Sequence, residues 1–202
     1  AMQSKYPGLE FEAGGEQEER NTAYGSLGVG LLISLFGIYG LLAIPLKSYL
    51  QPLVVMSVVP FGAIGAITGH YALSVDLMFF SALGIVALTG VVVNASLVLV
   101  DYSNRRRRAG ESIEEAITAS AIVRFRPIIL TSVTTFVGLI PLMTTTTPST
   151  APFLPMAVSL AWGVLFSTFI TLLLVPCLYL MAEDFATGLS LSLIHISEPT
   201  RR

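Results

Sequence analysis

The chain has few charged residues and a single cysteine, and both shortages narrow the kinds of protein that it can be. Charged residues make up 12% of its 202 residues, whereas hydrophobic residues make up 53%. Soluble domains carry about 25% charged residues, so this composition indicates a membrane protein. The lone Cys177 excludes an internal disulfide. Because it lies in an apolar run, we expect it to be a small buried hydrophobe.

The motifs of soluble enzymes are also missing. The sequence contains no P-loop, HExxH, GxSxG or CxxC pattern, and His70 is the only histidine before the C-terminal tail, so a catalytic triad is not plausible. His70 lies beside Tyr71 at the end of an apolar stretch, where interfacial aromatic residues are common. We therefore expect no enzyme activity, no cofactor and no metal site.

The apolar residues fall into five segments. Between residues 21 and 100 the only charges are Lys47 and Asp76, and between residues 127 and 182 there are none. A membrane-spanning helix needs about 20 mostly apolar residues. The sequence therefore predicts an all-α polytopic membrane protein with spans at residues 22–44, 51–71, 77–101, 126–146 and 153–181.

Positive charges predict the orientation of these spans. Lys47 and the arginines at 105–108, 124 and 126 lie in the loops after the first and third spans, whereas five glutamates lie between residues 10 and 19. Because positive loops stay in the cytoplasm, we expect the N-terminal segment to face outward and the C-terminus to be cytoplasmic. The four arginines at 105–108 are interpreted as an anchor to anionic membrane lipid, not as a nucleic-acid site.

Two further segments stand apart from the spans. Ser112 and Glu115 have the spacing of a capping box, and the apolar stripe that follows predicts an amphipathic helix at residues 111–122 on the cytoplasmic face. Residues 186–202 include "LSLIHISEPTR", which looks like a translated sequencing adapter, so we interpret them as a non-native tail. Residues 1–20 are polar and acidic without the apolar core of a signal peptide, which suggests a piece of a longer protein.

Polar residues at membrane depth are the candidate site, since such residues are functional by default. Asn94 lies halfway along the third span, and Asp101 follows it by two helical turns. In the fourth span Thr131 follows Arg124 by the same interval, with more hydroxyls at Thr134 and Thr135. Other interpretations stay open. Asn94 could form a hydrogen bond to a neighbouring helix, worth about 0.6 kcal/mol. Arg124 could be an interfacial anchor, and the threonine hydroxyls could bond carbonyl oxygens of their own helix.

Several motifs together resemble one known family. "VVPFGAIGA", "GVVVNASLVLVDYSN", "RFRPIILTSVTTFVGLIPLM" and "VPCLYL" are similar to the C-terminal half of resistance-nodulation-division (RND) efflux permeases, and most of all to the hydrophobe/amphiphile exporters that include the acriflavine-resistance pump. The resemblance covers about residues 1–185. It implies that residues 1–20 end the second periplasmic domain and that the five spans are the last five of twelve.

The resemblance also implies a function. Such permeases are trimers of the bacterial inner membrane that exchange protons for drugs or other amphiphiles and work with a periplasmic adaptor and an outer-membrane channel. The family's proton-relay positions match Asn94, Arg124 and Thr131, whereas Asp101, Thr134 and Thr135 are weaker candidates. The charge expected beside Asn94 is absent, because Val93 and Ala95 occupy the two neighbouring positions. Two alternatives are an exporter of lipids or other hydrophobic molecules and a non-transporting membrane protein of the same fold. We expect the 202 residues alone to be inactive.

Overall fold

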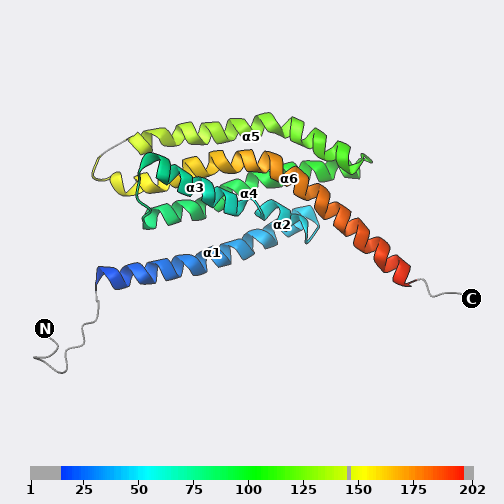
Figure 1. The fold of residues 1–202 in the computed structure, drawn as a ribbon, viewed down its shortest axis with the longest axis horizontal. Helices are drawn as coiled ribbons and strands as arrows, with labels where there is room; N and C mark the ends of the chain where they lie inside the picture. Colours follow the sequence, from blue (N-terminus) through cyan, green and yellow to red (C-terminus); the bar gives the residue numbers. More distant parts are fainter. Residues whose placement is uncertain (1–14, 145–146, 198–202) are drawn as a thin grey trace, which may run out of the picture. The chain divides into compact units, whose positions relative to one another are not determined.

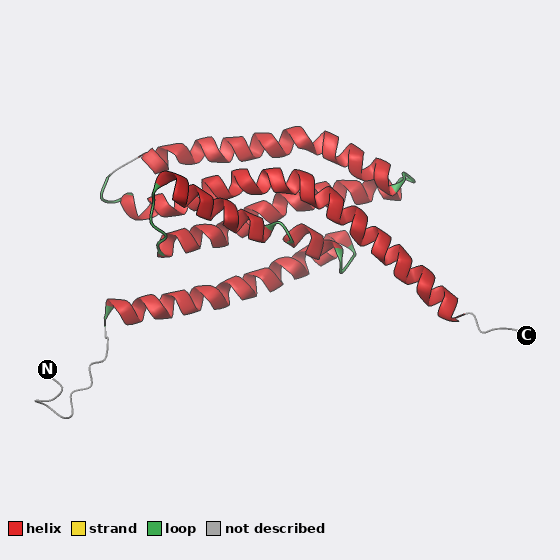
Figure 2. Ribbon diagram, in the orientation of Figure 1, coloured by secondary structure: helices red, strands yellow, loops and turns green. Residues whose placement is uncertain are grey.

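The structure, a computed structural model, describes residues 15–144 and 147–197, and every regular element in these ranges is helical (Figure 1; Figure 2). In chain order the elements are α1 (Glu16–Leu46), α2 (Gln51–Met56), α3 (Val59–Leu73), α4 (Phe79–Arg108), α5 (Ile113–Thr144), the short 3₁₀-helix η1 (Ala151–Phe153) and α6 (Leu154–Ser197). The predicted all-α class is therefore confirmed.

Five stretches of the described chain are long and apolar enough to cross a membrane. They are Asn21–Leu46, Gln51–Leu73, Phe79–Arg108, Ile113–Thr144 and Ala151–Glu183. Each contains one of the five predicted spans or most of it, and the predicted breaks after the first and second spans fall where the backbone turns at Lys47 and Ser74. The chain is a multi-pass membrane protein.

The second span is interrupted, which the sequence analysis did not predict. α2 ends at Met56 and α3 begins at Val59. Pro60, in the first turn of α3, has no N–H with which to bond the Met56 carbonyl four residues earlier. The two residues between the helices, Ser57 and Val58, keep right-handed backbone angles, so the apolar stretch still continues in one direction as a span.

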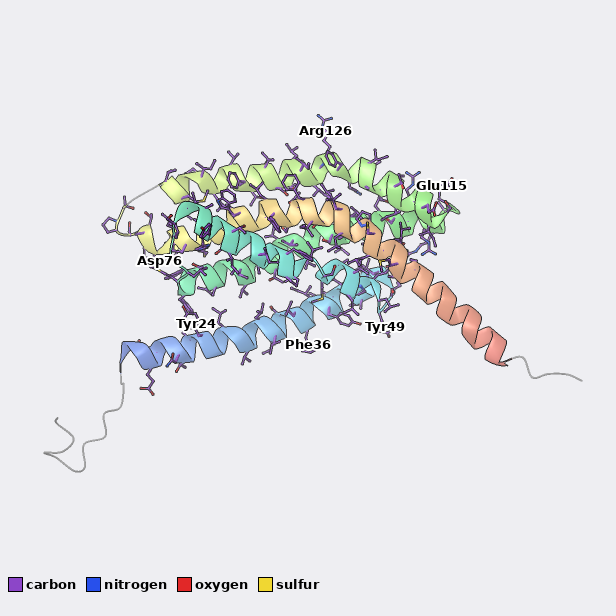
Figure 3. All side chains as sticks on the ribbon, viewed as in Figure 1. Tyr24, Phe36, Tyr49, Asp76, Glu115 and Arg126 are labelled. Atoms are coloured by element: carbon purple, nitrogen blue, oxygen red, sulfur yellow. The ribbon has the colours of Figure 1, made fainter. Side chains whose placement is uncertain are left out.

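The charged region between the third and fourth spans differs from the prediction. α4 continues through the arginines to Arg108, because arginine favours helix and its charge suits a helix C-terminus. The predicted amphipathic helix at 111–122 is not separate: it is the first part of α5, which begins at Ile113 and runs on past Pro127. Proline is tolerated inside membrane helices, and Figure 3 shows Arg126, beside this proline, where α5 bends.

The predicted capping box is confirmed at the start of α5. The Glu115 amide donates to Ser112 Oγ at 3.3 Å, and Glu115 Oε2 accepts from the Ser112 amide at 3.3 Å. α6 continues to Ser197, but the side chains of the predicted non-native tail, like residues 1–14, lie outside the described residues. Cys177, predicted to be buried, is instead exposed on α6, because it lies on the helix face opposite the buried Val175 and Tyr179.

The helices that form the site pack around α6. The chain divides at Leu35/Phe36 into two units, and all packing described below lies within the second. There α6 contacts α3, α4 and α5, and the helices run alongside one another (Figure 1). Glycines allow the close approach: a Cβ added at Gly65 or Gly69 of α3 would lie 2.4 Å from Phe166 or Trp162 of α6. Small residues at such contacts are typical of membrane helices.

Candidate functional site

Residues of three helices line an open cavity of about 310 Å³, and most of the predicted site residues belong to this lining. From α4 it is lined by Val91, Val92, Asn94, Ala95 and Val98; from α5 by Arg124, Pro127, Ile128, Thr131, Ser132 and Thr135; and from α6 by Val164, Ser167, Thr168 and Thr171. The lining thus combines several polar side chains with apolar ones. Asn94, Arg124, Thr131 and Thr135 are brought together, whereas Asp101 and Thr134 do not line the cavity.

Asn94 is the only side chain with a hydrogen-bonding group among the residues of α4 that line the cavity. Its side chain is exposed, while the preceding Val93 is 5% exposed and packs in the core. Val93 thus faces the apolar core, whereas Ala95, the other position at which a charge was expected, lines the cavity. Within the described chain the Asn94 amide makes no hydrogen bond, so it does not link α4 to the other described helices.

Arg124 lies at one end of the cavity with its guanidinium against an aromatic ring. Its Cζ lies 4.8 Å from the centroid of the Tyr102 ring of α4, a distance typical of a cation–π interaction. The Nε atom is buried and has no hydrogen-bond partner in the described chain. Arg124 is thus half-buried, and its guanidinium is turned toward Tyr102 of α4.

The threonines of α5 divide between the cavity and the outer surface. Thr131 and Thr135 line the cavity, whereas Thr134 is exposed away from it. All three hydroxyls donate to carbonyl oxygens of their own helix, at 2.9 Å from Thr131 to Ile128, 2.7 Å from Thr134 to Leu130, and 2.8 Å from Thr135 to Thr131. Their oxygens still have free lone pairs, so Thr131 and Thr135 can accept a hydrogen bond from an occupant of the cavity.

α6 contributes a row of hydroxyls that the sequence analysis did not single out. Thr168 Oγ1 lies 2.5 Å from Ser132 Oγ and so joins α6 to α5. Thr171 is 1% exposed, and its Oγ1 has no partner in the described chain. Ser167 completes the row. The signal was present in "FSTFIT", where hydroxyls at i, i+1 and i+4 share one side of an otherwise apolar helix.

Asp101 belongs to a set of ion pairs at the end of α4 and not to the cavity. Its Oδ2 lies 2.9 Å from Arg105 Nε. Glu111 binds Arg106 with two contacts of 2.6 Å, and these hydrogen bonds from Arg106 lower the pKa of the Glu111 carboxyl. Arg107 pairs with Glu183 at 2.6 Å. Three of the four arginines at 105–108 are therefore paired within the chain. The predicted lipid anchor is left with fewer free charges than the sequence suggested.

A buried polar network joins α2, α4 and α6 near these ion pairs. The Gln51 and Asn104 amides bond each other reciprocally at 3.1 and 2.7 Å. Gln51 also donates to Glu183 at 2.9 Å, and the Tyr179 hydroxyl donates to Asn104 Oδ1 at 2.8 Å. Gln51 and Asn104 are each 7% exposed and Tyr179 is fully buried. Every one of these groups is paired, as buried polar groups must be, so the network fixes how the three helices meet.

His70 has a structural position at the other end of the bundle. It is 3% exposed, with Nδ1 3.0 Å from the Ala66 carbonyl oxygen and Nε2 2.9 Å from Ser81 Oγ. Since a carbonyl only accepts, Nδ1 carries the hydrogen and Nε2 accepts from the serine. His70 thus ties α3 to α4. In the described ranges no three His, Cys, Asp or Glu side chains gather as metal ligands.

Comparison with known proteins identifies the family. The family model for "AcrB/AcrD/AcrF family" matches residues 2–183. The chain is 29% identical over 154 residues to the multidrug resistance protein MdtC of Proteus mirabilis (strain HI4320) and to that of Pantoea ananatis (strain AJ13355), covering 76% of this chain and 15% of each relative. It is thus much shorter than these relatives.

A solved structure agrees with this assignment. The crystal structure of a heavy metal efflux pump is similar with a TM-score of 0.73 and 29% identity, over 85% of this chain and 17% of that one. The family predicted from the sequence motifs is therefore confirmed. With a family match across nearly its whole length, the chain belongs to the AcrB/AcrD/AcrF family of RND efflux permeases.

Proposed function

We propose that the chain is the C-terminal membrane part of a proton-driven RND permease that exports drugs or other amphiphilic small molecules. In this proposal it is a transporter and not an enzyme, it lies in the bacterial inner membrane, and it functions as a homotrimer with a periplasmic adaptor and an outer-membrane channel. Its N-terminal segment is periplasmic and its C-terminus cytoplasmic. The multidrug relatives support the cargo class.

The cavity between α4, α5 and α6 is the observation that carries the proposal. It combines one cation, Arg124, one amide, Asn94, and several hydroxyls, and no carboxylate lines it. Such a lining suits a carboxylate supplied by the rest of the permease. Asn94 would donate a hydrogen bond to that carboxylate, and Arg124 would favour its ionised form. Proton binding would then weaken both interactions, and this difference is what couples the proton to a conformational change.

The absence of a lysine at the cavity has a chemical consequence for this coupling. A hydrogen bond from a neutral amide stabilises an ionised carboxylate less than an ammonium group does. Since Asn94 is the only polar side chain that α4 contributes to the cavity, Arg124 is the only fixed positive charge in its lining. The carboxylate is therefore expected to take up its proton at higher pH than it would beside a lysine.

Export by the complete permease tests the proposal. In cells that depend on it for efflux of a fluorescent amphiphile, Asn94→Leu should abolish energy-dependent export. Val91→Leu is the matched control, because Val91 lines the same cavity one turn earlier and the change adds volume without removing a polar group. Export should survive in the control. Unchanged export in Asn94→Leu, at equal amounts of protein in the membrane, would refute the assigned role.

A heavy-metal ion is a second cargo class, because the similar solved structure is that of a heavy metal efflux pump. The same cells, challenged with copper, silver or zinc salts, distinguish the two. Protection against amphiphiles without protection against metals supports the first proposal, and the reverse pattern supports the second.

A further inference from the structure

Arg124 is the only cation that lines the cavity, and no carboxylate of the described chain holds it. Three acidic side chains are instead paired with arginines of α4: Asp101 with Arg105, Glu111 with Arg106, and Glu183 with Arg107. Arg126 lies two residues after Arg124 on α5, but it is exposed and points away from the bundle (Figure 3). Within the described chain, therefore, no ion pair sets the position of the Arg124 guanidinium.

The aromatic ring of Tyr102 is the group that contacts it. The Arg124 Cζ lies 4.8 Å from the ring centroid, well inside the range of about 6 Å over which cation–π attraction operates. Tyr102 follows Asn94 by eight residues of α4, which is about 12 Å along the helix axis. The ring thus lies beyond the amide, toward the arginine-rich end of α4, and it holds the guanidinium at that end of the cavity.

The ring is itself held in place. Arg106, one turn further along α4, lies with its Cζ 5.9 Å from the same ring centroid. Arg106 is fixed in turn by two contacts of 2.6 Å with Glu111, in the turn between α4 and α5. Tyr102 is therefore connected to the α4–α5 turn on one side and to Arg124 on the other.

An aromatic partner has a chemical advantage over a carboxylate at this place. A carboxylate would neutralise the guanidinium and use two of its N–H donors in a bidentate pair. A ring face attracts the cation but accepts none of its in-plane N–H groups, so charge and donors remain available. The Arg124 Nε atom fits this arrangement, because it is buried and its N–H has no hydrogen-bond partner in the described chain.

We propose that Tyr102 is a positioning residue for the proton relay, which holds the Arg124 guanidinium at the cavity by cation–π contact without neutralising it. The inference rests on the proposed function, because it assigns to Tyr102 a role that is exerted through Arg124. It adds to that function a residue outside the cavity lining.

Substitutions in the complete permease test this role. Tyr102→Leu removes the ring and should lower the rate of amphiphile export about tenfold, the loss of one desolvated cation–π contact. It should also shift the pH at which export is half-maximal. Tyr102→Phe keeps the ring face and should restore both the rate, to within about twofold, and the pH profile. A purely structural role for Tyr102 would change the amount of protein but not the pH profile.

The outcomes separate the two proposals. If Arg124→Ala abolishes export but Tyr102→Leu keeps the wild-type rate and pH profile, the role of Tyr102 is refuted and the proposed function stands. If Tyr102→Phe loses as much as Tyr102→Leu, the hydroxyl and not the ring matters, and the inference is likewise wrong. If Arg124→Ala itself exports normally, the proposed function fails. Should Tyr102→Leu not reach the membrane, Tyr102→Met replaces it.

Discussion

Replacing Gly65 by alanine should weaken the contact between α3 and α6. The added Cβ would lie 2.4 Å from Phe166 Cβ and 3.1 Å from the Trp162 carbonyl oxygen. Neither atom can move independently of the α6 backbone, so α3 would have to shift by about 1 Å to restore an ordinary contact of 3.4 Å. Overpacking of this kind costs about 1–3 kcal/mol, and the better helix propensity of alanine returns about 1 kcal/mol. A net loss of about 1 kcal/mol is expected.

Unfolding of the 202-residue chain in detergent measures this change. Trp162 is its only tryptophan and lies at the altered contact, so tryptophan fluorescence reports the transition directly. Gly138→Ala is the matched control: it also lies within a helix, but a Cβ there would meet nothing within 4 Å. The control should be unchanged or stabilised by up to about 1 kcal/mol. Equal stability of the two variants would show that α3 and α6 do not pack through Gly65.

Three further predictions concern the polar contacts. Asn104→Leu removes the partner of the Gln51 amide oxygen and of the Tyr179 hydroxyl and should lower the free energy of unfolding by about 1–3 kcal/mol. The same fluorescence measures it, and a neutral effect would contradict the network. A double-mutant cycle of Ser132→Ala and Thr168→Val should give a coupling of about 0.6 kcal/mol, and a value of zero would show that the hydroxyls do not interact. The hydrogen bonds from Arg106 lower the pKa of Glu111, so wild type should be more stable than Glu111→Gln above about pH 4.5, and this difference in the free energy of unfolding should vanish as the pH falls through the lowered pKa. A difference that does not depend on pH would contradict this pairing.

Much of the fold was predictable because membrane spans leave a strong signal. Long uncharged apolar stretches define the five segments, and the Ser112–Glu115 capping box located the start of α5. The break at Pro60 and the continuity across Pro127 were not predictable by the same means. Both sites contain a proline within an apolar run, and whether the helix ends or only bends there depends on the neighbouring helices.

The candidate site was predictable in part. The spacing of seven residues within α4 and within α5 placed Asn94, Arg124 and Thr131 on surfaces that proved to share one cavity. The same spacing included Asp101, which instead pairs with Arg105 at the helix end. The contribution of α6 was not predicted, because Ser167, Thr168 and Thr171 lie in a span without charged residues, where hydroxyls stand out little among the apolar side chains. The Tyr102 contact with Arg124 joins two helices, and no periodicity within one helix reveals it.

Proton movement in proteoliposomes tests the central claim most directly. The complete permease would be reconstituted as wild type, as Asn94→Leu and as Thr134→Val, the last removing a hydroxyl from the outer face of α5. Proton flux would be followed with an internal pH dye after addition of an amphiphilic substrate. Wild type and Thr134→Val should show substrate-dependent proton flux, and Asn94→Leu should show none. Equal substrate-dependent flux in all three would contradict the assignment of the cavity to proton coupling.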